Sequence, residues 1–277
     1  MIVERIGKAS AFGTSLTGLA LAMSPCVGLS QQQGAEQEET QVAAAPGEAQ
    51  QEQPQWNEVR IVHVKGERMG EFEGLLKELS AALSESNLPA FDVWQVAAGE
   101  LNTYHIVAAL ESLAQFGEMD TLPMEPLEWA NWVNRIESTV DSQELILAEV
   151  HPDLSIEPDA QAAGEPPELL MLLSQTVMPG RSQEYETWLR EEVLPALRES
   201  DIDGVISNRL TFGADNRTWV FAVPISSWSE LGQPSPLHRS MGEQAAEEML
   251  NRGDSMVERS ETIVLRARPE LSGGGGA

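Results

Sequence analysis

The sequence predicts an α+β fold built from two tandem repeats, and three observations carry this prediction. The expected elements follow the order strand, helix, strand, strand, helix, strand, and the same order then returns. The two halves also match residue by residue. Finally, strands such as "HIVAAL" and "WVFAV" are apolar on both faces, so each sheet should be covered on both sides.

The first repeat begins with a β-rich run, "VRIVHVK", and continues with an amphipathic helix. In that helix the apolar residues form one stripe, which consists of Phe72, Leu75, Leu76, Leu79 and Leu83. The expected strands cover 59–65, 91–98, 103–110 and 143–150, and the expected helices cover 69–86 and 125–140.

The second repeat has a counterpart for each of these elements. Its expected strands cover 169–177, 203–212, 217–225 and 260–267, and its expected helices cover 182–200 and 242–257. Such a complete second set of elements in the same order predicts a duplication rather than two unrelated domains.

Matching residues support the duplication. Phe72 corresponds to Tyr185 at an offset of 113 residues, and Pro152 corresponds to Pro269 at an offset of 117. The slow drift is what a few loop insertions produce. The last strand of each repeat is followed by a similar motif, "HPDL" and then "RPEL". Because proline has no amide hydrogen to donate, we expect it to end strand pairing in both copies.

This order of elements, together with the strand that precedes "MPGRSQEYETWLREEVLPAL", resembles the dimeric α+β barrel superfamily of ferredoxin-like domains. The antibiotic-biosynthesis-monooxygenase and NIPSNAP-like families are the most similar in character. The resemblance spans roughly residues 57–271. It implies two four-stranded sheets that pack against each other around a small cavity, here within one chain as a pseudo-dimeric α+β barrel. Elementary packing agrees, because a sheet with helices on one face must cover its other face.

The overall charge limits the partners. The formal net charge is -27 and the sequence pI is about 4.3. A surface this acidic repels nucleic-acid backbones and anionic membranes, so we expect no nucleic-acid partner. A small neutral or cationic ligand remains compatible with it.

The N-terminus predicts export to the periplasm or secretion. A short basic start with Arg5 and Lys8 precedes a mildly apolar stretch, and small residues precede Gln31, so residues 1–30 are expected to be a signal peptide. A membrane anchor and lipidation at Cys26 are the alternatives. Since Cys26 is the only cysteine, cleavage would leave a mature chain without thiols, disulfides or cysteine-bound metals.

The remaining boundaries follow from composition. Residues 31–56 are rich in Gln, Glu, Ala and Pro, which predicts a disordered linker. We expect the first repeat at 57–156, an inter-repeat linker at 157–167, the second repeat at 168–271 and a flexible glycine tail at 272–277. No stable membrane span is expected after signal cleavage.

Two histidines are candidates for a functional pair. With the usual strand order 4-1-3-2, His63 at the end of the first strand and His105 near the start of the third are expected to be neighbours. His151 ends the fourth strand, so a metal site of three histidines is not expected. The second repeat is expected to place Thr176 and Trp219 at the matching positions. The alternative is that the pair is buried in the sheet without a function.

Strand aromatics offer a second hint. Trp94, Tyr104 and Trp219 lie on expected strands and, with the two histidines, could line an apolar cavity for a small apolar or aromatic ligand. Core packing is the alternative for each of them.

The resemblance also raises haem, because chlorite-dismutase-like relatives bind haem through one histidine. On this basis His238, before the last helix, would be the axial ligand. No basic cluster for haem propionates is present, however, and no cofactor is the leading expectation. No metal site is expected.

Three functional hypotheses stay open. The first is a small-molecule-binding or interaction module of the cell envelope. The second is a cofactor-independent monooxygenase-like enzyme that uses the barrel cavity, as the resemblance implies. The third is a haem protein. No phosphate loop, nucleophile elbow or zinc helix is present, so catalytic residues stay unassigned. The sequence does not decide whether the chain forms further homo-oligomers.

Overall fold

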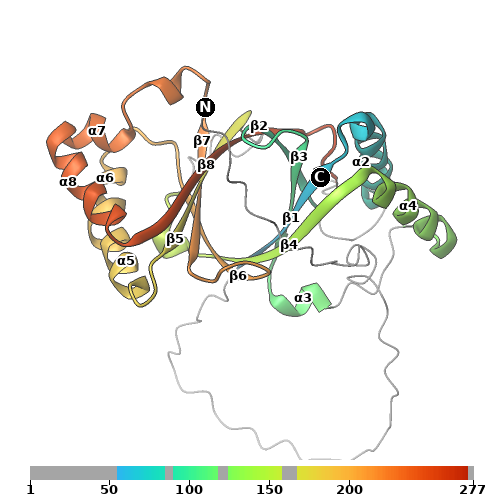
Figure 1. Cartoon of the computed structure of the whole chain (residues 1–277), viewed down its shortest axis with the longest axis horizontal. Coiled ribbons are helices and arrows are strands. Elements are labelled where there is room, and N and C mark those ends of the chain that lie inside the picture. Colours follow the sequence, from blue (N-terminus) through green and yellow to red (C-terminus); the bar gives the residue numbers. More distant parts are fainter. Residues whose placement is uncertain (1–54, 85–89, 118–123, 158–166, 274–277) are drawn as a thin grey trace, which may run out of the picture.

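The computed structural model describes residues 55–84, 90–117, 124–157 and 167–273. These residues form one closed antiparallel barrel with the strand order β1-β3-β2-β8-β5-β7-β6-β4. Helices lie outside the barrel wall on two opposite sides, with α2 and α4 on one side and α5 to α8 on the other (Figure 1). The predicted fold class, a pseudo-dimeric α+β barrel in a single chain, is confirmed.

The first repeat contributes half of the barrel, the two long helices α2 and α4, and the short helix α3. Its buried helical stripe includes Phe72, Leu75 and Leu76, as the sequence pattern predicts. Its elements are β1 (Trp56–Val64), α2 (Met69–Ser84), β2 (Asp92–Ala98), β3 (Thr103–Leu110), α3 (Leu113–Gly117), α4 (Pro126–Thr139) and β4 (Val140–Val150).

The second repeat differs mainly in its helices. The single helix expected at 182–200 is divided by a π-helical turn, Leu189–Val193. The turn lies just before Pro195, which cannot donate to the carbonyl group of Glu191 and whose ring would clash with it in a regular α-helix. The elements are β5 (Leu169–Val177), α5 (Ser182–Trp188), α6 (Leu194–Arg198), β6 (Ile206–Phe212), β7 (Thr218–Ile225), α7 (Pro236–Met241), α8 (Glu243–Asp254) and β8 (Val257–Ala267).

Each repeat keeps the expected strand order, β4-β1-β3-β2 in the first and β8-β5-β7-β6 in the second. Two hydrogen-bonded seams join the repeats. At one seam β2 pairs with β8, where Trp94 lies opposite Ala267, and at the other β4 pairs with β6, where Val150 lies opposite Asn208. The two sheets are therefore joined edge to edge on both sides, so neither repeat has an unpaired edge strand.

The two faces of the barrel wall have different environments. The outer face packs against the helices in two cores, one for each repeat. On the inner face, a smaller cluster around Trp94, Val96 and Leu265 contains residues of β2, β3, β5 and β8 but none from a helix. The interior of the barrel, towards which this face points, is called the lumen below.

The ends of the two repeats are exchanged. After β4, the 3₁₀ turn Pro152–Leu154 carries Leu154 into the helix-side core of the second repeat. After β8, Leu271 enters the core of the first repeat. Both strands thus end just before the repeated proline motif, and the shared structural role explains why the two motifs have similar sequences. Leu154 and Leu271 are both buried, so each repeat completes the core of the other.

The structure also refines the expected boundaries. β1 begins at Trp56, the last residue of the expected linker. Gly273, within the expected flexible tail, forms an antiparallel bridge with Phe91, and the Ser272 hydroxyl accepts a hydrogen bond from the amide of Val93. The expected signal peptide, most of the two linkers and residues 274–277 lie outside the described residues. Among the described residues, no helix is long and apolar enough to cross a membrane.

Candidate functional site

The register of the strands defines which side chains face the lumen. His105 on β3 lies opposite Ile61 on β1 and Trp94 on β2. Directly opposed residues share one face of a sheet. The neighbouring residues Val62 and Tyr104 pack against helices of the first repeat and so mark the outer face. Ile61, His105 and Trp94 therefore face the lumen.

The structure brings His63 and His105 together on this inner face. His63 lies opposite Thr103, so it is the diagonal neighbour of His105. Its Nδ1 lies 3.1 Å from the hydroxyl oxygen of Thr103, in hydrogen-bonding contact, and 3.6 Å from a carboxylate oxygen of Glu100. His63 is half-buried near the mouth of the lumen, whereas His105 is deeper.

His105 is the most unusual polar group of the inner face. Only 7% of it is exposed, and its side chain makes no hydrogen bond among the described residues. Burial, with a smaller contribution from the charge of His63, lowers the pKa of His105 to about 4. At neutral pH the ring is therefore uncharged. It offers one N–H donor and one nitrogen acceptor to whatever occupies the lumen beside it.

Asp92 adds a carboxylate to the same face. It lies opposite Val107, two residues along β2 from Trp94, so it is the next residue on the same face after the Trp94–His105 pair. The Asp92 side chain reaches solvent, but the protein atoms around its carboxyl group remove part of its hydration and so raise its pKa. This combination is expected of a side chain inside an open, concave space rather than on a convex surface. The sequence analysis did not select Asp92. The alternation in "FDVWQV" was the available signal, because it places Asp92 on the same face as Trp94.

The rest of the inner face combines partly buried apolar side chains with a few exposed charged ones, among them Glu144 opposite Ile61 and Glu261 opposite Ser174. An eight-stranded antiparallel barrel has an interior just wide enough to hold one small ligand or to be filled by side chains. Here many lumen-facing side chains keep some exposure, which favours the first case. The half-buried apolar residues on this face are Val59, Ile61, Val107, Leu170, Leu172, Val220, Ala222 and Ile263.

The second repeat does not reproduce the histidine pair. Thr176 lies opposite Thr218, and their hydroxyl oxygens are 2.9 Å apart, which matches the His63–Thr103 contact. The position that corresponds to His105 holds Val220, which lies opposite Ser174. The expected match between Trp219 and His105 is therefore wrong by one residue. Any site built on His105 occurs once per chain.

Tyr104 and Trp219 do not line the lumen, which corrects the expectation from the sequence. They occupy corresponding positions on the outer face, one in each helix-side core. The Tyr104 hydroxyl donates a hydrogen bond of 2.8 Å to Glu73. Trp219 packs against Phe221 and Tyr185. Of the three aromatic candidates, only Trp94 faces the lumen.

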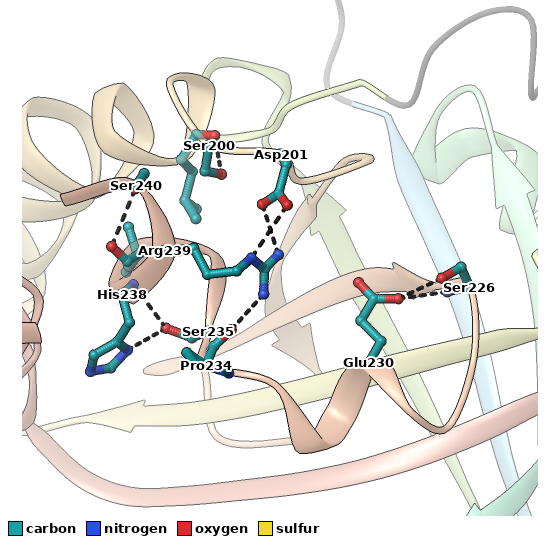
Figure 2. A network of polar contacts seen from close by, with 11 residues as sticks. Ser200, Asp201, Ser226, Glu230, Pro234, Ser235, His238, Arg239 and Ser240 are labelled. Carbon is teal, nitrogen blue, oxygen red and sulfur yellow. Dashed lines mark hydrogen bonds and ion pairs between the residues drawn. The ribbon is translucent and has the colours of Figure 1, made fainter. Parts of the chain in front are cut away.

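The other two histidines lie away from the pair. His151 follows β4 and packs against Trp219 with ring centroids 4.7 Å apart, whereas the β4 residue opposite His63 is Ser142. His238 lies on α7 outside the barrel, where its Nδ1 is 2.7 Å from the hydroxyl oxygen of Ser235 (Figure 2). Within the described ranges, no three His, Cys, Asp or Glu side chains form a group that could hold a metal ion.

No protein-family model matches this chain, and no curated protein matches it either. Solved structures do match. A protein from Lactobacillus acidophilus NCFM that is assigned as a monooxygenase is 10% identical, with a TM-score of 0.53 over 81% of this chain and 98% of the other. A second one, from Fusobacterium nucleatum, is also 10% identical, with a TM-score of 0.54 over 81% and 96%.

An anthrone oxidase-like protein is 11% identical, with a TM-score of 0.53 over 79% of this chain and 92% of the other. At such low identity these likenesses show the fold alone. They agree with the architecture derived from the register, so the resemblance to the dimeric α+β barrel superfamily is confirmed at the level of the fold.

Proposed function

We propose that this protein binds a small, largely apolar ligand in the barrel lumen and that His105 forms the directing hydrogen bond. One observation carries the proposal. His105 is a buried, uncharged imidazole without a hydrogen bond among the described residues, and it lies in a lumen whose other side chains are mostly apolar. Natural ligand sites combine an apolar lining with a few such polar groups.

The neighbours of His105 indicate the character of the ligand. The indole of Trp94 lies beside His105 and offers a flat apolar surface for an aromatic ring. Asp92, one step further along the same face, would repel an anion. The net charge of -27 acts in the same direction over longer distances. A neutral or cationic aromatic molecule therefore fits this lumen better than an acid.

Binding is favoured over proton abstraction because of the pKa of His105. A general base works best when its pKa lies near the working pH. A pKa of about 4 leaves His105 unprotonated at neutral pH but makes it a weak base. Cofactor-independent oxygenation, which the resemblance implies, remains the alternative function. It would gain support if a bound molecule were consumed in the presence of oxygen.

Two further parts of the proposal rest on the sequence. We place the protein outside the cytoplasm, in the periplasm or secreted, because residues 1–30 have the character of a signal peptide. Haem is not part of the proposed function. Its candidate ligand, His238, lies on α7 outside the barrel and contacts Ser235 through Nδ1.

Native mass spectrometry of the full chain purified from its host tests the proposal, combined with titration of the neutral fluorophore N-phenyl-1-naphthylamine. We expect a co-purified molecule or saturable dye binding. His105→Val, which copies Val220 of the second repeat, should weaken that binding at least about tenfold, because the ligand loses its polar partner. His238→Asn is the matched control and should leave it unchanged. A ligand-free mass with no dye binding would refute the proposal.

A further inference from the structure

A row of four residues on the inner face leads from solvent into the interior of the barrel. Glu144 of β4 lies opposite Ile61 of β1. Ile61 lies opposite His105 of β3, which in turn lies opposite Trp94 of β2. Because directly opposed residues share one face of a sheet, all four side chains point towards the lumen.

Burial increases along this row. Glu144 is exposed and Ile61 is half-buried, whereas His105 and Trp94 are only 7% and 8% exposed. The strands of a barrel are tilted against its axis, so a row that crosses them runs obliquely from a mouth of the barrel into its interior. A molecule that follows the row would therefore keep one end in contact with solvent at Glu144 and bury the other end beside His105 and Trp94.

The mouth beside Glu144 is bordered by residues that the structure describes. The turns at this end of the barrel are 99–102 between β2 and β3 and 213–217 between β6 and β7. Gly213 packs against the backbone of Leu145, which is the chain neighbour of Glu144. With these turns in place Glu144 is still exposed, so solvent reaches it although it points inwards.

Glu144 is an unpaired carboxylate. Among the described residues it makes neither a hydrogen bond nor an ion pair. His63 lies opposite Ser142, two residues before Glu144, so it is the diagonal neighbour of Glu144 on the same face. Glu100, in the turn between β2 and β3, brings a second carboxylate to 3.6 Å from the Nδ1 of His63. Two glutamates thus gather around one histidine at this mouth.

The second repeat keeps the glutamate but not the rest of the arrangement. Glu261 occupies the corresponding position of β8, opposite Ser174. Its carboxylate is paired, because the Arg259 guanidinium donates a hydrogen bond of 3.4 Å to it. The row then continues through Val220 to Asn208, so its buried end has neither an aromatic ring nor a histidine. An unpaired carboxylate and a buried aromatic end occur together only in the row of the first repeat.

We propose that the lumen binds an organic cation in which a short alkyl arm joins an aromatic ring to an ammonium group. The ammonium group would donate hydrogen bonds to Glu144 and Glu100, and the ring would lie beside His105 and Trp94. Glu144 and His105 are two strands apart, which separates their Cα atoms by about 10 Å. Both side chains point inwards, so a short arm spans the distance. The inference rests on the proposed function of the lumen and narrows its ligand class.

Two independent observations favour a cation over a neutral or anionic ligand. The first is His105, a nine-tenths buried side chain without a hydrogen bond, which points to a ligand in this lumen. It is uncharged at neutral pH and so does not repel an ammonium group. The second is the unpaired charge of Glu144. A neutral ligand would leave this carboxylate without a partner, and an anion would be repelled by it.

Isothermal titration calorimetry of the full chain at pH 7.5 tests the proposal with three ligands that share one indole ring. Tryptamine is the cation, tryptophol is its neutral counterpart and indole-3-acetate is the anion. We expect tryptamine to bind at least about tenfold more tightly than tryptophol, and indole-3-acetate to bind most weakly. Glu144→Gln should reduce the advantage of tryptamine over tryptophol to about twofold or less, because the charged partner is lost.

Matched variants separate a site at Glu144 from general attraction to an acidic protein. Glu261→Gln removes the same charge at the corresponding position of the second repeat and should leave the advantage of tryptamine within about twofold of that of the parent. Ser142→Arg copies Arg259, which pairs with Glu261, and should abolish the advantage by pairing with Glu144. Equal effects of Glu144→Gln and Glu261→Gln would refute the proposal.

The remaining outcomes distinguish this inference from the proposed function. If tryptamine bound no more tightly than tryptophol, or if only N-phenyl-1-naphthylamine bound, the cation would be wrong and ligand binding in the lumen would stand. If none of these molecules bound saturably, both proposals would fail. If Asp92→Asn removed the advantage of tryptamine and Glu144→Gln did not, the assignment of the ammonium group to Glu144 would be overturned.

Discussion

His151 and Arg268 occupy corresponding positions after the last strand of each repeat, and each packs against the other repeat. The His151 ring lies 4.7 Å from the ring of Trp219 in the second repeat. The Arg268 guanidinium donates a hydrogen bond of 2.8 Å to Glu73 in the first repeat. Pairs of residues from different repeats thus stabilise both helix-side cores, and their loss should be measurable.

Arg268→Met should destabilise the protein by about 2 kcal/mol, because Glu73 would keep a half-buried carboxylate without its cation. The hydrogen bond from Arg268 is the main cause of the lowered pKa of Glu73. Urea unfolding followed by circular dichroism measures the effect. Arg190→Met, which breaks the exposed pair with Asp153, should cost less than about 1 kcal/mol. If both variants lost the same free energy of unfolding, the cross-repeat pair would contribute no more to stability than the exposed pair.

Leu271→Ala should cost about 3 kcal/mol, because Leu271 is fully buried in the core of the first repeat. Leu101→Ala, at an exposed leucine of the β2–β3 turn, should change the free energy of unfolding by less than about 0.5 kcal/mol. Thermal unfolding of both variants checks the prediction. If the last residues did not belong to the core, the two variants would behave alike.

The stability of the protein should fall as the pH is lowered from 6.5 towards 4. His105 has a pKa of about 4 in the folded protein and close to 6.5 when unfolded, so the unfolded chain takes up a proton first. The contribution is fully present above pH 6.5. About 2 kcal/mol of it should be lost between pH 7.5 and pH 5.

His105→Val removes this titration, so its free energy of unfolding should lose about 2 kcal/mol less than that of the parent over the same interval. His238→Asn, outside the barrel, serves as the control. Urea midpoints at pH 7.5, 6 and 5 give the comparison. A parent and a His105→Val variant with the same pH dependence would contradict the buried, neutral state of His105.

Gly213→Ala should destabilise the protein by about 3 kcal/mol or more. Gly213 has φ = 80°, and a Cβ there would overlap the backbone carbonyl oxygen of Leu145 on β4. Gly180 also has φ = 80° but has open space around it. Gly180→Ala should therefore cost only about 1 kcal/mol, which isolates the close approach of the β6–β7 turn to β4. Thermal unfolding of both variants measures the difference.

Local patterns were enough to predict much of the fold. The strands at 103–110 and 169–177 have the observed boundaries, because both are runs rich in β-branched and other apolar residues that end at turn residues. The usual strand order of ferredoxin-like repeats, 4-1-3-2, which the sequence analysis adopted, is also the observed order within each repeat. The two seams depend on pairing between residues far apart in the chain, and local patterns do not report their register.

The candidate site was predictable only in part. The strand order alone indicates that His63 and His105 are neighbours. The face of each side chain depends on register, and a shift of one residue moves a side chain to the opposite face. Tyr104 and Trp219 were misplaced for this reason. The α7 helix was not expected, because its six residues are too few to show a helical period.

The exchanged ends have a consequence for the peptide that connects the repeats. Leu154 and Leu271 each belong to a core formed mostly by the other half of the chain. A protease that cut between Glu157 and Pro167 would therefore release nothing. The two fragments would stay associated, because the last residues of each are buried in the core of the other. Since the halves associate without the covalent link, its length and sequence can change in evolution while the barrel is kept.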